Sequence, residues 1–120
     1  MLLGRPVKQI AYYVNDVREA AVRHSALFGS GPFFALDYPP LPVIYRGKES
    51  FLSQSQAVGQ WGTIQIELMQ DNGDGPSILS DLYKKGSGRT GIHHMGLLVD
   101  SLEAAVASCK EAGYEEVMRA

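Results

Sequence analysis

An internal repeat is the feature of this sequence that most constrains its fold. Residues 9–22 recur as residues 94–106, with one additional residue, Arg18, in the first copy. Each copy starts with the alternating pattern of a β-strand and continues with the spacing of an amphipathic helix, which ends at Gly29 or at Gly113. Because the change of period falls at the same place in both copies, the repeat predicts a duplicated strand–helix module.

Each predicted helix has its own start signal and apolar face. Asn15 or Asp16 can cap the first helix, and Asp100 or Ser101 can cap the second. The apolar faces consist of Val17, Ala20, Ala21, Leu27 and Phe28 in the first copy and Leu102, Ala105, Val106, Cys109 and Ala112 in the second. We therefore expect Cys109 to be a small packing residue and not a nucleophile.

The composition limits the chain to one ordinary domain. It has 120 residues, of which 45% are hydrophobic and 20% charged, and a net charge of −2, so it is too short for two cores. It contains no basic run that would neutralise phosphates and no apolar run of signal-peptide or membrane-span length, so we expect neither nucleic acid nor a membrane as partner. The single cysteine excludes an internal disulfide, which favours a reducing compartment and predicts a cytoplasmic location.

The segment between the two copies contains further strand patterns. Residues 32–36 predict a short strand, and the proline-rich residues 39–42 predict a loop that cannot join a central ladder. Residues 43–52 favour a hairpin that residues 54–57 prolong, and residues 77–82 favour a short helix. We therefore expect the first copy to continue into several more strands.

Residues 63–69 give the clearest strand pattern in the chain. Ile64, Ile66 and Leu68 alternate with the other residues and are expected to pack on the helices. Glu67 lies between them and therefore points to the opposite face. A carboxylate buried on that face needs a metal ion or a hydrogen-bond donor, because an unpaired buried charge is costly.

The repeat places two more polar residues on the same face. Gln9 and His94 occupy equivalent positions, each next to a small residue, Ala11 or Gly96. Because successive side chains of a strand alternate between faces, both are expected to point away from the helices. If the sheet curls around this face, Gln9, His94 and Glu67 converge in one cavity.

Each of these residues also has an ordinary structural explanation. His94 could be a hydrogen-bonded barrel histidine, Glu67 an exposed strand carboxylate, and Gln9 a neutral residue in a cavity wall. His93 precedes His94 directly, so alternation predicts that it points to the opposite face in a structural role.

Four segments resemble the vicinal oxygen chelate superfamily, which includes glyoxalases, methylmalonyl-CoA epimerases, extradiol dioxygenases and bleomycin-resistance proteins. They are residues 9–16, 29–34, 64–68 and 91–95. The resemblance implies an α+β fold in which paired βαβββ modules form a curled mixed sheet. Residues 1–120 would form one glyoxalase-like domain, with module one at about 5–72, a linker and loop at about 73–91, and an incomplete module two at about 92–120.

The resemblance also implies a divalent metal ion between the two modules. Its ligands would be Gln9, Glu67 and His94, together with a carboxylate from the last strand of module two. This set is similar to the Gln, Glu, His and Glu ligands of animal-type glyoxalases. Glu67 would be both a ligand and the catalytic candidate, and Zn²⁺, Ni²⁺, Co²⁺ and Mn²⁺ all suit such oxygen and nitrogen donors.

The fourth ligand has no counterpart in this sequence. Glu67 follows Gln9 by 58 residues, and the same interval after His94 reaches about position 152, beyond Ala120. Three explanations stay open: the sequence is a piece of a longer chain, a partner chain completes the barrel, or the site has been lost. We expect a homodimer, because a half-barrel exposes sheet edges and an apolar cleft.

Three functions fit these observations. The first is a metal-dependent lyase or isomerase of the glyoxalase or epimerase type, which acts on a small substrate with adjacent oxygens through an enediolate. The alternative is a non-catalytic protein that sequesters a small molecule. Its cavity walls would come from Tyr13, Phe33, Phe34, Tyr45 and Trp61. The third function, which we rank last, is an extradiol dioxygenase. Its facial triad consists of two histidines and a carboxylate, and Gln9 stands in the place of one of those histidines.

Overall fold

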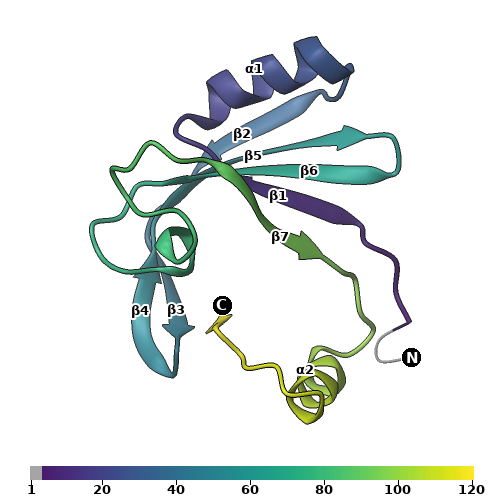
Figure 1. The fold of residues 1–120 in the computed structure, drawn as a ribbon, viewed down its shortest axis with the longest axis vertical. Coiled ribbons are helices and arrows are strands. Elements are labelled where there is room, and N and C mark those ends of the chain that lie inside the picture. The colour runs from purple at the N-terminus through teal and green to yellow at the C-terminus, as the bar shows by residue number, and fades with distance from the viewer. Residues whose placement is uncertain (1–3) are drawn as a thin grey trace.

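Two α-helices, one 3₁₀ helix and eight strands make up residues 4–120, which the computed structural model describes (Figure 1). In chain order they are β1 (Gln9–Tyr13), α1 (Val17–Phe28), β2 (Phe33–Asp37), β3 (Leu41–Tyr45), β4 (Lys48–Leu52), β5 (Gln54–Trp61), β6 (Ile64–Asp71), η1 (Ile78–Ser80), β7 (Gly91–Gly96), α2 (Leu102–Glu111) and β8 (Met118–Arg119). The large sheet has the order β2-β5-β6-β1-β7 and the small sheet β4-β3-β8. These curled mixed sheets with helices confirm the predicted fold class.

Helix α1 begins and ends where the sequence predicts. The Asp16 side chain accepts hydrogen bonds from the backbone N–H groups of Arg18 and Glu19, and Gly29 closes the helix in the left-handed conformation, at φ 69°. The buried face of the helix packs on one face of the large sheet. The buried residues of this layer are Val17, Ala21, Ala57, Ile66 and Leu68. Helix α1 therefore fixes which side of β6 is core.

The two copies of the repeat lie side by side in the large sheet. Strand β1 pairs with β7 in antiparallel orientation, so that Gln9 faces Gly96 and Ala11 faces His94. Residues 9 and 94 are equivalent in the repeat, as are 11 and 96, and the pairing exchanges them. The two first strands are thus related by an approximate two-fold axis, as expected when a duplicated module pairs with itself.

The β3–β4 hairpin differs from its prediction at both ends. Strand β3 already starts at Leu41 and includes Pro42, which pairs with Phe51 of β4. Pro42 is tolerated because β8 pairs only with Ile44 and Tyr45, so that β3 has one neighbour at the proline. Residues 54–57 do not prolong the hairpin, because they begin β5, which pairs with β6 and β2 of the large sheet.

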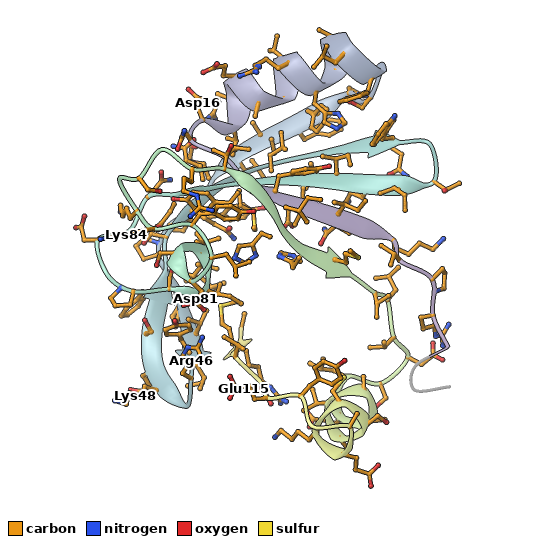
Figure 2. The ribbon with its side chains drawn as sticks, in the orientation of Figure 1. Asp16, Arg46, Lys48, Asp81, Lys84 and Glu115 are labelled. Carbon is orange, nitrogen blue, oxygen red and sulfur yellow. The ribbon has the colours of Figure 1, made fainter. Side chains whose placement is uncertain are left out.

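A second core lies on the face of the large sheet that points away from α1. The hairpin and η1 cover it, and its buried residues are Ala11, Tyr13, Val43, Leu52, Met69 and Leu79. Arg46 forms ion pairs with Asp81 and with Glu115, which join the hairpin turn to the segments that follow η1 and α2 (Figure 2).

Helix α2 has the predicted local design but different packing. Ser101 caps it through a hydrogen bond from the backbone of Ala104, and Gly113 follows in the left-handed region. No residue of α2 is buried in the described structure, and Figure 1 shows α2 lying away from the large sheet. The predicted apolar face therefore remains without a sheet to cover, and Leu102 is 57% exposed. Within residues 4–120, neither helix is both long and apolar enough to cross a membrane.

His24, which lies on α1, should make the free energy of unfolding depend on pH. Burial lowers the pKa of His24 from its ordinary value of 6.5, so the unfolded chain binds a proton more readily than the folded one. We expect the His24 contribution to the free energy of unfolding to be complete above pH 6.5 and to be lost as the pH falls through the lower folded pKa.

The measurement is urea unfolding at several pH values, followed by the fluorescence of Trp61, whose ring centroid lies 5.1 Å from that of His24. The variant His24→Gln should lack this part of the pH dependence. Identical pH profiles for the two proteins would contradict the assignment.

Candidate functional site

Three neighbouring strands bring the predicted polar residues together on what we call the site face, the face of the large sheet that points away from α1. Gln9 lies on β1, Glu67 on β6 and His94 on β7. The Gln9 amide Nε2 donates to Glu67 Oε2 at 3.3 Å, and His94 Nε2 lies 3.5 Å from Glu67 Oε1. The predicted convergence of the three side chains is thus observed, while their roles stay predictions.

Glu67 is the buried carboxylate of this cluster. The residue is only 9% exposed, and burial raises the pKa of its carboxyl, while hydrogen bonds from Gln56 and Gln9 act in the opposite direction. His94 lies against it and would form an ion pair with it only when protonated. Burial, followed by the charge of His93, lowers the pKa of His94. The shift of His94 favours its neutral imidazole, which can bind a cation directly, whereas Glu67 would have to give up its proton to bind one as a carboxylate.

Two glutamines complete the polar cluster and were not singled out in the sequence. Gln56 on β5 donates to Glu67 Oε2, and Gln65 on β6 accepts from Gln9 Nε2 at 2.6 Å. The alternation along β5 carries the signal for Gln56, because the small residues Ser55 and Ala57 on either side of it are buried. Oε2 of Glu67 therefore accepts hydrogen bonds from two amide groups, whereas Oε1 faces His94.

His93 does not point to the opposite face as alternation predicts. A register shift between Ala11 and Tyr12 makes His93 an extra residue of β7, a β-bulge, which breaks the period of two. His93 Nδ1 consequently lies 2.9 Å from His94 Nδ1, and His93 Nε2 lies 2.7 Å from the carbonyl oxygen of Ile78. Within the described residues both ring nitrogens of His93 therefore have a partner on the site face.

The donors at this site fit a divalent cation. Within residues 4–120 no group of three His, Cys, Asp or Glu side chains could hold a metal ion. The third donor beside Glu67 and His94 is instead an amide, that of Gln9. Rotation of that amide would present its oxygen in place of its nitrogen. A carboxylate, an imidazole and an amide oxygen are ligands of borderline metals such as Zn²⁺, Ni²⁺ and Co²⁺.

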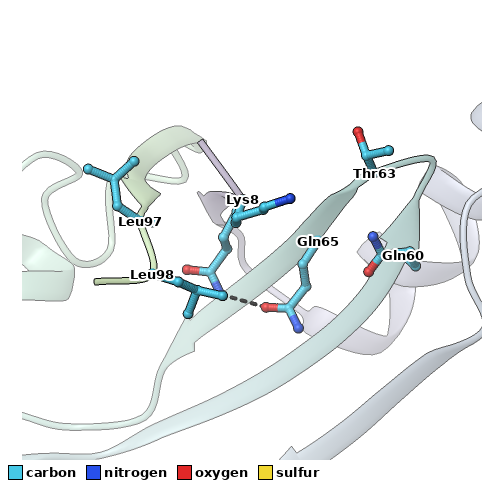
Figure 3. Close-up of a pocket in the computed structure, with 8 residues that line it drawn as sticks. Lys8, Gln60, Thr63, Gln65, Leu97 and Leu98 are labelled. Carbon is cyan, nitrogen blue, oxygen red and sulfur yellow. Dashed lines mark hydrogen bonds between the residues drawn. The ribbon is translucent and has the colours of Figure 1, made fainter. Parts of the chain in front are cut away.

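A cleft of about 450 Å³ opens beside Gln9 (Figure 3). Amide and hydroxyl groups line one side and leucines the other. The lining residues are Lys8, Gln9, Gln60, Thr63, Gln65, Gly96, Leu97 and Leu98. The hydrogen bond between Gln9 and Gln65 forms part of its wall, so a molecule in the cleft would lie next to the polar cluster.

The aromatic residues considered for cavity walls separate into two groups. Tyr13 and Tyr45 belong to the core on the side of the site face. Phe33 packs against the α1 layer instead, and Trp61 contacts His24 of α1. None of the five aromatic residues, Phe34 included, lines the cleft beside Gln9 in the described structure, so a role for them in ligand binding stays a prediction.

Replacing Gly96 by Ala tests the role of Gln9 without changing any polar group. A Cβ atom at Gly96 would lie 2.8 Å from Gln9 Oε1 and 2.9 Å from Gln9 Cβ, so the Gln9 side chain must move. We expect Gly96→Ala to lower the affinity for Co²⁺ about tenfold, measured by calorimetric titration. Gly75→Ala is the matched control, because its Cβ would meet nothing within 4 Å. Equal affinities would show that Gln9 is not a ligand.

Several solved structures share this fold. A methylmalonyl-CoA epimerase superposes with a TM-score of 0.55 at 21% identity, over 89% of this chain and 70% of that one. The methylmalonyl-CoA epimerase of Mycobacterium tuberculosis gives 0.58 at 18% identity, over 89% and 63%. The Streptomyces coelicolor enzyme, in complex with 2-nitronate-propionyl-CoA, gives 0.58 at 15% identity, over 94% and 74%.

The family is shown by the sequence itself. A comparison with curated proteins found no match. The family model described as Glyoxalase/Bleomycin resistance protein/Dioxygenase superfamily matches residues 8–120. Since that match includes both copies of the repeat as well as Gln9, Glu67 and His94, the chain belongs to the glyoxalase/bleomycin resistance protein/dioxygenase superfamily.

Proposed function

We propose that the chain is part of a divalent-metal-dependent isomerase of the epimerase type, which moves a proton at a carbon next to a carbonyl group. The observation that carries the proposal is the contact between Glu67 Oε1 and His94 Nε2, 3.5 Å apart, with Gln9 beside them. Gln9 and His94 come from equivalent positions of the repeat on the paired strands β1 and β7, and Glu67 comes from β6, the other neighbour of β1, so the arrangement suits a shared ligand set.

In this proposal Gln9, Glu67 and His94 hold the metal ion. When bound, the ion supplies Lewis-acid polarisation of a substrate oxygen. Gln9 and His94 are neutral ligands, so they leave most of the positive charge of the ion uncompensated. Glu67 is the one carboxylate among them.

The two oxygens of Glu67 have different partners. In the metal-free chain Oε2 accepts from Gln56 and Gln9, and Gln56 would continue to hold the carboxylate when the Gln9 amide turns its oxygen to a metal ion. Oε1 faces His94 and accepts from no amide within residues 4–120, so Oε1 is the oxygen of Glu67 that is open to a cation or to a proton. In the metal-free chain, burial raises the pKa of this carboxyl, so it holds a proton more readily than an exposed carboxylate does.

The cleft beside Gln9 is the proposed entrance for the substrate. Lys8 brings a positive charge to it, while Leu97 and Leu98 offer apolar surface. A carbonyl compound with a second oxygen nearby and an apolar or acyl extension suits this lining. The fold shared with methylmalonyl-CoA epimerases supports a thioester of that kind as the first substrate to test.

The test is exchange of the substrate proton with solvent. The chain loaded with Co²⁺ is incubated in D₂O with methylmalonyl-CoA, and deuterium at the carbon next to the thioester is followed by mass spectrometry. We expect metal-dependent incorporation that is lost in Glu67→Gln and kept in Glu49→Gln, an exposed carboxylate on β4. Binding of the thioester without exchange, in the absence of metal, would favour sequestration instead.

A homodimer is proposed for the same protein. Side chains on β7 and just after it leave a large apolar area exposed, with Met95 63% and Leu98 73% exposed. Strand β7 is also the edge of the large sheet, and exposed apolar edges favour pairing with another chain. Mass spectrometry under native conditions should give twice the chain mass, and a monomer at micromolar concentration would contradict the proposal.

A further inference from the structure

The contacts of His93 determine where its proton lies. His93 Nε2 is 2.7 Å from the carbonyl oxygen of Ile78. A carbonyl oxygen only accepts hydrogen bonds, so His93 Nε2 must carry a hydrogen. In the neutral imidazole the other nitrogen, Nδ1, is then an acceptor.

The acceptor on His93 determines the proton position on His94 in turn. The two Nδ1 atoms lie 2.9 Å apart, so His94 Nδ1 must donate to His93 Nδ1. A neutral His94 then has no hydrogen on Nε2. That bare nitrogen is the atom that lies 3.5 Å from Glu67 Oε1.

The start of this chain of contacts is firmly held. Ile78 is the first residue of η1, which Ser77 and Ser80 fix through reciprocal capping hydrogen bonds. Leu79, the next residue, is 1% exposed in the core of the site face. The β-bulge of β7 turns His93 toward this carbonyl. The carbonyl group that binds His93 is therefore fixed by a segment anchored in the core.

We propose that His93 is a positioning residue that holds His94 in the Nδ1–H tautomer and so keeps His94 Nε2 open toward Glu67. The consequence for ligand binding rests on the proposed metal function, whereas the tautomer is a property of the metal-free chain. The competing arrangement places the hydrogen on His94 Nε2, where it would donate to Glu67 and block a cation. A ligand histidine usually donates its second N–H to a fixed acceptor, and here that acceptor is His93.

Nitrogen NMR of the metal-free chain tests the tautomer directly. The sequence has 3 histidines, so a protein labelled with ¹⁵N-histidine gives three ring systems in a long-range ¹H–¹⁵N spectrum. At about pH 8, where ordinary imidazoles are neutral, we expect hydrogen on Nε2 of His93 and on Nδ1 of His94. Hydrogen on Nε2 of His94 in the unaltered protein would overturn the proposal.

Two substitutions at the same position separate positioning from packing. His93→Leu removes the acceptor, and we expect His94 to change to the Nε2–H form with an affinity for Co²⁺ about 10–100-fold lower. His93→Asn offers Oδ1 as acceptor, and we expect it to keep the tautomer and an affinity within about threefold. Thermal unfolding confirms that both variants are folded.

The ring of His24, which contacts Ser30 Oγ on the other side of the sheet, is the internal control and should be unchanged in every spectrum. If His93→Leu keeps both the tautomer and the Co²⁺ affinity, the proposal is wrong. If the unaltered chain shows the expected tautomers but binds no Co²⁺, the proposed function fails while the role of His93 in setting the tautomer stands.

Discussion

Replacing Glu67 by Gln should lower the affinity of the chain for divalent ions by about 100-fold or more. Loss of a residue that only supports a metal ligand costs about 10–100-fold in affinity, and loss of the ligand itself should cost more. The exchange keeps the shape of the side chain, and a glutamine can still accept hydrogen bonds from Gln56 and Gln9. Calorimetric titration with Co²⁺ measures the change. The control is Glu49→Gln, which makes the same chemical change at an exposed position of β4.

The same substitution should stabilise the metal-free protein at neutral pH. Burial raises the pKa of Glu67 above its ordinary value of 4.5, so the folded state binds the proton more tightly than the unfolded state. Its contribution to stability is complete below pH 4.5 and is lost as the pH rises through the higher folded pKa. Glu67→Gln removes this loss. The free energy of unfolding of the variant, measured with urea, should therefore decline less as the pH rises than that of the unaltered protein.

Added metal should reverse the order of stability, since an ion that binds only the folded state stabilises it. The unaltered chain should gain stability with Co²⁺, and Glu67→Gln should not. Equal Co²⁺ affinity of the two proteins, or the same gain in stability, would be incompatible with Glu67 as a ligand.

Replacing Ile66 by Ala should have the largest effect on folding. Ile66 is completely buried between β6 and α1, and loss of its methyl and methylene groups leaves a cavity. Such substitutions cost about 2–5 kcal/mol, a large part of the roughly 5–15 kcal/mol of a typical domain. Ile66→Val, which removes a single methylene, should cost about 0.5–1.5 kcal/mol.

Urea unfolding measures both costs, and Val22→Ala is the control, because Val22 lies on α1 but is 71% exposed. Its cost should stay within about 0.5 kcal/mol. The folded fraction of Ile66→Ala should keep its Co²⁺ affinity, since Ile66 points away from the site face. A loss of affinity as large as that of Glu67→Gln would mean that the two faces of β6 are not independent.

Local signals in the sequence account for the parts of the fold that were predicted. The caps Asp16 and Ser101 mark the start of both helices, and the alternation around Ile66 marks the two faces of β6. Convergence of the polar cluster followed from combining that alternation with the repeat. The repeat was informative because equivalent strands pair with each other across an approximate two-fold axis.

The features that were missed depend on contacts between distant segments. The bulge that turns His93 onto the site face arises from the register of β7 against β1, which alternation within one strand does not reveal. Pro42 joins a strand because its neighbour is present on only one side. Gln56 lies 11 residues from Glu67 in sequence, and only the antiparallel register of β5 on β6 brings the two together.

Calorimetric titration of the chelator-treated chain with Co²⁺ tests most directly whether Gln9, Glu67 and His94 form a metal site. We expect one ion per chain, with binding lost in both Glu67→Gln and His94→Ala and retained in Glu49→Gln. A folded chain that binds no divalent ion, or that binds it equally well without Glu67 and His94, would contradict the account.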